Sequence, residues 1–207
     1  AGVIREEAVE LVRCKTVPID VPAEAEIVIE GEILSETREP EGPFGEFTGY
    51  ASYRSTENVF VAKRIQMRSD AIFHSIASGT AGDHILVSSI SREAEILNSL
   101  RRNLPNVIAV HVPLCTVGAL MAIVGMKKTA EGQPKQAIMA ALGTEFYVKT
   151  VVVVDDDIDP TDTNEVLWAM CTRTEVTEDI DIVKRMWSTS LDPMAYAGDG
   201  PRYYNNR

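Results

Sequence analysis

The sequence has no uninterrupted run of about 20 apolar residues, the length that a membrane-spanning helix needs. The first residues, AGVIREEAVE, contain neither the basic stretch nor the apolar stretch of a secretory signal. We therefore expect a cytoplasmic protein. The 207 residues, of which 45% are hydrophobic, are enough to bury a core and to form one large or two small domains.

Positive charge is scarce. The sequence contains 20 Lys and Arg residues against 31 Asp and Glu residues, which gives a net charge of −11 at pH 7. Such a surplus of negative charge repels the phosphate backbone of nucleic acids, and no basic run offsets it. Nucleic acid is therefore not an expected partner.

Cysteine and histidine are also rare, with three of each. Cys14, Cys115 and Cys171 are far apart in apolar or mixed sequence, which favours reduced thiols in a core over disulfides or a CxxC metal site. The histidines form no HExxH or HxH pair, so no single motif supplies a metal site rich in imidazole. The GxxxxGK, GxGxxG and GxSxG motifs are missing as well. We therefore name no metal ligand in this chain.

Up to about residue 87 the hydrophobic pattern has a period of two, which indicates β-strands. In AEIVIEGEI, Ile27, Ile29 and Ile33 alternate with glutamates, as in an antiparallel strand with one buried face. NVFVAKRIQM repeats the pattern, and AIFHSIA predicts another short strand that ends at the glycines of GTAG. Residues 1–87 are therefore predicted to form a β-rich portion.

From residue 88 to residue 191, helical and strand patterns alternate, which favours an α/β layer. Ala94, Leu97, Leu100 and Leu104 recur at helical spacing, and Pro105 ends that helix. The strings VIAVHV, LMAIVGM and VVVV predict strands. The predicted fold class is therefore α/β, or α+β when both portions are counted together.

Two further helices are marked by their ends. Pro134 predicts the start of one helix, and Gly143 predicts its end in a left-handed conformation. Asp162 and Glu165 have the spacing of a capping box at the start of the next helix. Residues 192–207 show no periodicity and are predicted to form an irregular tail.

The string PEGPFGEFTGY at residues 40–50 differs from the rest of the sequence. Its three glycines and two prolines favour a stiff loop that holds Glu41 and Glu46 beside aromatic side chains. Apolar neighbours such as Phe44 and Phe47 can raise the pKa of a carboxyl group towards neutrality, which suits a proton donor. Composition alone leaves the alternative of a structural turn with solvated glutamates.

This string closely resembles the signature of the UbiD-like decarboxylases, which use prenylated FMN to decarboxylate aromatic or α,β-unsaturated acids. The resemblance continues in family order through AGVIR, ELVRCKTVPIDVPAEAEIVIEGEI, SREAEILNSLRRNLPNVIAVHVP, PKQAIMAALG and VKTVVVVDDDIDPTDTNEVLWAMCTR. It implies a split-barrel arrangement for the β-rich portion. It also implies catalytic roles for Glu46 as the proton donor and for Glu41 as its partner in an Arg-Glu-Glu network over the flavin.

The resemblance implies a reversible reaction in which the substrate joins the cofactor through its Cα–Cβ unit, CO2 leaves, and a glutamate protonates the carbon. The family's arginine and its Asn, His and Glu metal ligands belong to an N-terminal domain that this sequence does not contain. A divalent metal is therefore expected from ligands outside the chain. The chain can be a fragment, a small subunit with a partner chain, or an inactive relative, and we expect a homo-oligomer or a second chain.

The resemblance also implies weaker cofactor contacts at Gly79, Thr80 and Lys149. The loop that contains Gly79 and Thr80 corresponds to one that lies near the flavin, with an ordinary hairpin turn as the alternative. Lys149 falls near a family lysine that faces the cofactor phosphate, a role that suits a compact positive charge. The alternative is a solvated lysine at the start of a strand.

Two other interpretations remain open. In one, the chain is a non-catalytic assembly or regulatory subunit that binds a partner through its β-rich face. In the other, Asp155, Asp156, Asp157 and Asp159 assist chemistry by binding a metal at the end of a buried strand. Turn and helix-cap hydrogen bonds are the favoured explanation of these aspartates.

Overall fold

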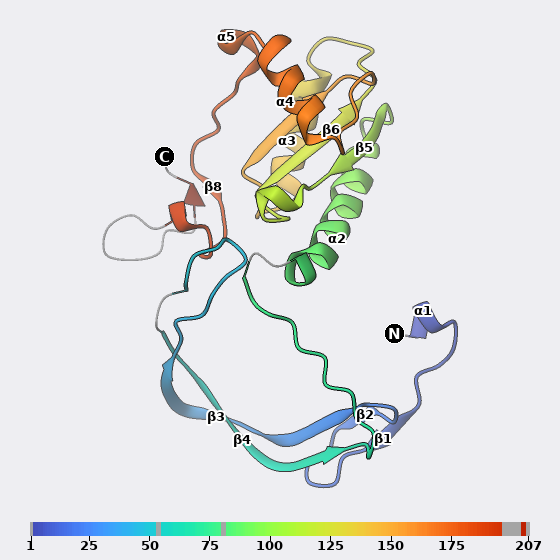
Figure 1. Cartoon of the computed structure of the whole chain (residues 1–207), viewed down its shortest axis with the longest axis vertical. Helices are drawn as coiled ribbons and strands as arrows, with labels where there is room; N and C mark the ends of the chain where they lie inside the picture. Colours follow the sequence, from blue (N-terminus) through green and yellow to red (C-terminus); the bar gives the residue numbers. More distant parts are fainter. Residues whose placement is uncertain (1, 53–54, 80–81, 196–203, 206–207) are drawn as a thin grey trace. The chain divides into compact units, whose positions relative to one another are not determined.

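The structure is a computed structural model that describes residues 2–52, 55–79, 82–195 and 204–205. The chain forms two compact units, whose elements are labelled in Figure 1. The first unit comprises Ala1–Phe44 and Ser52–Ile76, and the second comprises Gly45–Ala51 and Ala77–Arg207. The part of the PEGPFGEFTGY string that contains Glu46 thus belongs to the second unit.

The first unit is built from two antiparallel strand pairs. Its elements are helix α1 (Gly2–Arg5) and strands β1 (Leu11–Arg13), β2 (Asp20–Pro22), β3 (Ile27–Glu41) and β4 (Ser55–Met67). Strand β1 pairs with β2, and the long strands β3 and β4 form a two-stranded ribbon. The two period-two segments are therefore strands, as the alternation predicts, and the structure pairs them with each other.

The predicted burial of this ribbon is wrong. Ile29, Ile33 and Ile65 are more than half exposed, whereas Glu30 on the opposite face is buried. The Glu30 carboxylate accepts hydrogen bonds from the backbone N–H groups of Lys15 and Thr16, at 3.0 and 2.5 Å. It also accepts from the Thr16 hydroxyl and from the side-chain amide of Gln66. The loop after β1 therefore covers the polar face rather than the apolar one.

The strand predicted in AIFHSIA is also absent, because residues 71–78 form neither helix nor strand. Helix α2 spans Gly82–Arg101, so residues 82–87, which were predicted to belong to the β-rich portion, are helical. Among the described residues, no strand pairs with this run of seven residues, and an unpaired strand is not stable by itself.

The second unit contains a three-stranded sheet in the order β5-β6-β7, from Val107–His111, Met121–Met126 and Thr150–Val154. Strand β6 pairs antiparallel with β5 and parallel with β7. Helix α3 (Gln133–Thr144) provides the crossover between the parallel strands, and helix α4 (Thr163–Thr172) follows β7. Short elements complete the unit: η1 (Leu114–Thr116), α5 (Val176–Asp179), β8 (Met186–Trp187), η2 (Pro193–Ala195) and β9 (Tyr204–Asn205).

Helices cover both faces of this sheet, as Figure 1 shows. On one face, Ile96 and Leu100 of α2 and Ala137 and Ala141 of α3 pack with strand residues. On the other face, residues of α4 such as Val166 pack on the sheet. The mixed helix and strand content fits the α+β class, which is confirmed, and the second unit has the predicted α/β layer.

The ends of helices α3 and α4 agree only in part with those predicted from the sequence. The Asp162 carboxylate caps α4, accepting from the N–H groups of Asn164 and Glu165 at 2.9 and 3.2 Å. The Glu165 side chain, however, accepts from the N–H of Asp159 and not from that of Asp162. Gly143 does not end α3 in a left-handed conformation, because the helix continues to Thr144 and then becomes extended.

The three cysteines are free, but Cys115 and Cys171 are exposed, so the prediction that they are core thiols is wrong for those two. Cys115 lies in the short helix η1 and Cys171 in helix α4. On an amphipathic helix, neighbouring residues point to different faces, so an apolar sequence around a cysteine does not by itself place the thiol on the buried face. Among the described residues, no helix is long and apolar enough to cross a membrane.

Candidate active site

Glu41 and Glu46 of the motif lie in different units. Glu41 is the last residue of β3 and is exposed, and in the register of the ribbon it faces Ser55. The following Gly42–Pro43 peptide bond is cis. Phe44 then exchanges two hydrogen bonds with Ser52, its N–H donating to the Ser52 hydroxyl at 2.9 Å and its carbonyl accepting from the Ser52 N–H at 2.7 Å. Backbone pairing in the ribbon, and the Phe44–Ser52 hydrogen bonds that follow it, therefore fix the position of the Glu41 backbone.

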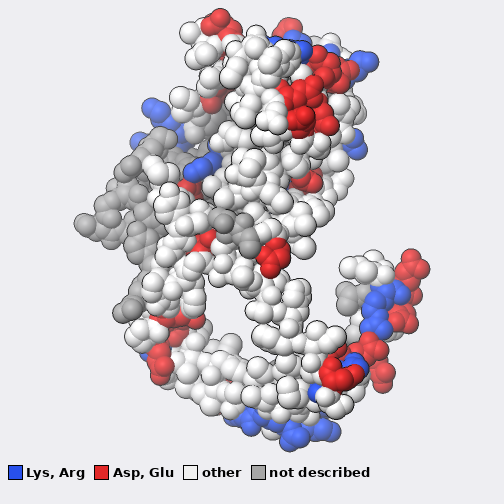
Figure 2. Space-filling view, viewed as in Figure 1, with Lys and Arg blue, Asp and Glu red and all other residues white. Residues whose placement is uncertain are grey.

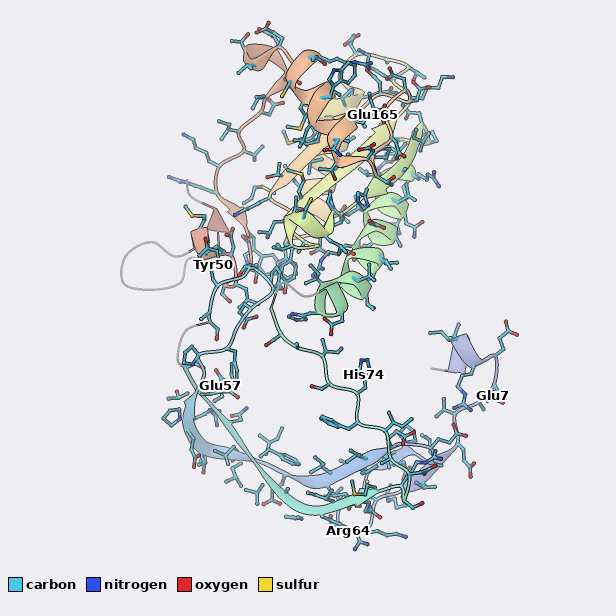
Figure 3. All side chains as sticks on the ribbon, in the orientation of Figure 1. Glu7, Tyr50, Glu57, Arg64, His74 and Glu165 are labelled. Carbon is cyan, nitrogen blue, oxygen red and sulfur yellow. The ribbon has the colours of Figure 1, made fainter. Side chains whose placement is uncertain are left out.

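Glu46 lies in a tight loop formed by Gly45–Ala51. The Glu46 N–H donates to the carbonyl of Tyr50 at 2.9 Å, and the Glu46 carbonyl accepts from the N–H of Gly49 at 3.0 Å. Gly49 has a φ of +81°, a conformation that glycine adopts without steric cost. Tyr50, which closes this loop, is labelled in Figure 3. The stiff loop that the glycines predict is therefore present, and the Glu46 side chain in it is half-buried.

Phe47 anchors this loop to the second unit. Its side chain is 8% exposed and forms a small core with Ile85 of α2 and Ala119. Its ring contacts the edge of the Tyr147 ring, with 5.8 Å between the centroids. Leu191 packs against the same core. Phe44, by contrast, is 51% exposed, so only one of the two aromatic residues of the motif fixes the position of Glu46.

A partly buried arginine lies beside this core. The Arg92 guanidinium lies over the Tyr147 ring, 4.6 Å from its centroid. It donates to the carbonyl of Gly118 at 3.1 Å and lies 3.6 Å from the Glu145 carboxylate. Nothing in the sequence distinguished Arg92 from the other charged residues of the α2 helix.

Lys149 forms an ion pair with a buried aspartate. Its ammonium donates to both carboxylate oxygens of Asp192, at 2.8 and 2.9 Å. The Asp192 side chain is fully buried, whereas that of Lys149 is 26% exposed. Tyr147 and Leu191, which pack around Phe47, stand next to this pair in the sequence. Lys149 is therefore not a solvated lysine, and Asp192, which was assigned to the irregular tail, is part of the core.

Gly79 lies before helix α2 and not in a hairpin turn. Its φ is +126°, and its backbone contacts the Nδ1 atom of His84 at about 3 Å. No side-chain atom surrounds the position where a Cβ would stand. The hairpin alternative is therefore wrong, and the cofactor contact remains a prediction. Thr80 lies outside the described residues.

The aspartates after β7 make turn and cap contacts. Asp159 accepts from the N–H and the hydroxyl of Thr161, both at 2.8 Å, and these bonds lower the pKa of its carboxyl group. Asp157 pairs with Arg173 at 2.8 Å. Acidic side chains gather near α4 in Figure 2, but no group of three potential metal ligands occurs in the described part of the chain. The favoured explanation therefore holds for the side chain of Asp159, which makes the contacts of a turn.

The second unit offers donors that suit an anionic ligand. Three buried side-chain atoms have no hydrogen-bond partner among the described residues: Thr48 Oγ1, Ser188 Oγ and Arg92 Nε, of which Arg92 Nε lies 3.6 Å from the Glu145 carboxylate and is already paired in charge. Thr48 lies in the loop that contains Glu46, and Ser188 lies four residues before Asp192. Hydroxyl, N–H and ammonium groups are donors from which a phosphate accepts hydrogen bonds, so the chemistry of Thr48, Ser188 and Lys149 fits the phosphorylated end of a flavin cofactor.

Comparisons with known proteins identify the family of this chain. Residues 1–81 match the 3-octaprenyl-4-hydroxybenzoate carboxy-lyase Rift-related domain, and residues 84–203 match the C-terminal domain of the same family. The chain therefore belongs to the UbiD family, as the signature indicates.

One curated relative is the anhydromevalonate phosphate decarboxylase of Methanothermobacter thermautotrophicus. It is 39% identical over 199 residues, which cover 94% of this chain and 46% of the relative. The UbiD-class enzyme HmfF from Pelotomaculum thermopropionicum, solved in complex with FMN, is also 39% identical, with a TM-score of 0.87. That comparison covers 95% of this chain and 43% of HmfF.

An evolved dimeric form of HmfF, solved in complex with prenylated FMN, has a TM-score of 0.84 and 39% identity. The match covers 88% of this chain and 42% of that protein. This chain thus spans less than half the length of the relatives that it matches.

Proposed function

We propose that this chain forms the part of a reversible, prenylated-FMN-dependent decarboxylase that holds the proton-donating glutamate. The substrates are aromatic or α,β-unsaturated carboxylic acids. Residues outside this chain supply the divalent metal site, either in the same protein or in a second chain. Family membership and the FMN and prenylated FMN complexes of HmfF support this proposal.

The observation that carries the proposal is that the Glu46 loop packs on the same small core as Tyr147 and Leu191, the sequence neighbours of Lys149 and Asp192. Phe47 follows Glu46 and packs on Tyr147, two residues before Lys149. A carboxyl group that can give a proton and an ammonium that can bind a phosphate are thus held by one core. A decarboxylase that depends on a phosphorylated flavin needs both groups.

Prenylated FMN, when bound, supplies the electron sink for the loss of CO2. The chain has three tasks. Lys149 holds the anionic end of the cofactor, with the buried hydroxyls of Thr48 and Ser188 as further candidate donors. Glu46 gives a proton to the substrate carbon once CO2 has left, and its half-buried position limits access of water. Glu41 acts as the network partner that influences the charge of Glu46.

The test compares Glu46→Gln with Glu41→Gln in the complete, active assembly. Glu46→Gln keeps the shape of the side chain but has no proton to give, so turnover should fall by a factor on the order of 10² or more. Glu41→Gln should reduce the rate less and shift the pH profile, because it changes a neighbouring charge rather than the donor. Flavin uptake and folding should survive both changes.

Exchange of the product hydrogen with deuterated water measures the protonation step by itself. Loss of exchange in Glu46→Gln supports the assignment. If Glu46→Gln exchanges at the unmodified rate while Glu41→Gln does not, the two roles are reversed. If neither change affects exchange, the motif has a structural role and the decarboxylase proposal is refuted for this chain.

A second candidate is a non-catalytic assembly or regulatory subunit. It is favoured by the exposed apolar face of the ribbon of β3 and β4, where Ile29, Ile33, Ile65 and Met67 are each more than half exposed. A face of this kind is typical of a surface that binds another protein segment. A purified assembly that contains this chain and shows no flavin and no decarboxylation would favour this alternative.

A further inference from the structure

We propose that Asp192 is a positioning residue that holds the ammonium of Lys149 in place for an anionic group, of which the flavin phosphate is the example. This inference rests on the proposed function, because Lys149 is the cofactor-binding lysine of that proposal. It adds a residue that no part of the motif contains and that lies 43 positions from Lys149 in the sequence.

Asp192 is itself fixed by the turn around it. Its Oδ1 atom accepts from the N–H of Met194 at 3.0 Å, and its carbonyl accepts from the N–H of Ala195 at 2.8 Å. Its own N–H donates to the carbonyl of Thr189 at 3.2 Å. A carboxylate that is fully buried and held by its own turn does not move aside when a ligand arrives.

Lys149 is fixed at its backbone and oriented at its tip. Its N–H donates to the carbonyl of Leu120 at 3.0 Å, which places the residue at the start of β7. The lysine stem is flexible, and the two contacts with Asp192 restrict it to one direction. An ammonium has three N–H donors, and two are used here, so one is left without an acceptor among the described residues.

The sequence neighbours of the pair connect it to the core that anchors the Glu46 loop. Tyr147 and Leu191 belong to the core of Phe47, the anchor of the Glu46 loop. Ser188, whose buried hydroxyl has no partner among the described residues, belongs to the same segment as Asp192. The Lys149 side chain retains 26% exposure, so a ligand can reach it, whereas Asp192 is covered. In this proposal the Lys149 ammonium contacts the fixed Asp192 carboxylate and an external anion at the same time.

The alternative is that Asp192 competes with the anion for Lys149. In that case the Asp192 carboxylate occupies the place of the anion and must release the ammonium before the anion can bind. The two ideas predict opposite results for Asp192→Asn. Asparagine keeps the shape of the side chain and the bond to the Met194 N–H, but it provides only one acceptor to Lys149 and no charge. If Asp192 positions the lysine, the variant binds an anion more weakly. If Asp192 competes, the variant binds it more tightly.

The experiment is a titration of the 207-residue chain with inorganic phosphate, followed by the NMR signal of the Lys149 ammonium at constant ionic strength. Lys149→Arg identifies the signal by its loss. We expect a saturable shift in the unmodified chain and an apparent Kd about tenfold higher in Asp192→Asn, the size expected for one hydrogen bond to a charged group. Asp157→Asn is the matched control, because it removes an equally short contact, with Arg173, elsewhere in the same unit.

The outcomes separate this inference from the proposed function. If Lys149 responds to phosphate with the same Kd in Asp192→Asn, or with a lower one, the positioning role is refuted and the phosphate role of Lys149 stands. If the unmodified Lys149 signal does not respond at all, its phosphate role is refuted and the inference with it, whereas the role of Glu46 is tested separately by deuterium exchange.

One measurement requires no variant. In the unmodified chain, the ammonium of Lys149 should rotate slowly because of its contacts with Asp192, and those contacts should persist when phosphate is bound. Persistence of the slow rotation and of the Asp192 carboxyl ¹³C shift at saturation supports positioning. Faster rotation together with a changed carboxyl shift means that the anion displaces Asp192, which overturns the inference even if Asp192→Asn does not fold.

Discussion

Replacing Phe47 by alanine tests whether the motif loop is anchored as the structure shows. The Phe47 ring is 8% exposed and packs with Ile85, Ala119 and Tyr147. Truncation of a buried Phe costs about 3–5 kcal/mol, which combines the lost transfer free energy with the cavity that remains. Because the ring keeps some exposure and the loop can partly collapse, we expect a loss of about 3 kcal/mol in the free energy of unfolding.

For a chain of this length, each kcal/mol lowers the melting temperature by about 2–4 °C, so the expected decrease is roughly 6–12 °C. Calorimetry of the chain measures this decrease, and limited proteolysis within Gly45–Ala51 should become faster at the same time. Phe44→Ala is the matched control: it removes the same side chain from the same motif at a site that is 51% exposed, where a change within about 0.5 kcal/mol is expected. Equal effects of the two substitutions would refute the anchoring of the Glu46 loop by Phe47.

Three further predictions concern the rest of the chain. Hydrogen bonds from the Lys15 N–H and the Thr16 hydroxyl lower the pKa of Glu30 from 4.5 to about 2. The stability that this carboxylate contributes is therefore fully present above pH 4.5 and is lost as the pH falls through 2. The free energies of unfolding of Glu30→Gln and of the unmodified chain should converge as the pH is lowered over this range. Asp162→Ala removes the cap of α4 and should cost about 1 kcal/mol in urea unfolding, whereas Asp156→Ala, which removes an exposed carboxylate of the same loop, should change little. Light scattering of the chain at micromolar concentration should report a mass above 22.7 kDa, because the apolar face of the ribbon is uncovered, and a stable monomer would contradict this expectation.

The α/β portion could be predicted in detail because its signals are local. The apolar positions of α2 recur at helical spacing, and Leu100 is buried as that spacing requires. Ala94 is exposed, however, and the buried Leu104 lies beyond the end of the helix at Arg101. The start of α4 is fixed by a cap that two neighbouring N–H groups complete. Signals of this kind need no knowledge of distant residues. Gly143 misled because a glycine near a helix end is permitted, but not obliged, to adopt a positive φ.

The β-rich portion could be predicted only as strands and not as a buried surface. Alternation shows that Ile29 and Glu30 point to opposite faces, but which face is covered depends on what the rest of the protein places there. Here the loop that contains Lys15 and Thr16 provides three hydrogen bonds to Glu30, and a carboxylate with that many donors can be buried. The usual assumption that isoleucines are inside and glutamates outside fails for this reason.

The candidate site shows the same division between local and distant information. The glycines and prolines around Glu46 predict a stiff loop because conformational preference belongs to each residue, and the loop is formed. The partner of Lys149 could not be predicted, because ion pairing depends on two segments that meet only after folding. The sequence nevertheless contained a signal for this pair. Asp192 lies in SLDPMA, among mostly small and apolar residues, and burying a charge among such residues costs free energy unless a residue of opposite charge pairs with it. An isolated charge in an apolar segment that lacks periodicity is therefore better interpreted as one half of a buried pair than as part of a loose tail, and in this chain the other half is the lysine expected to bind the cofactor.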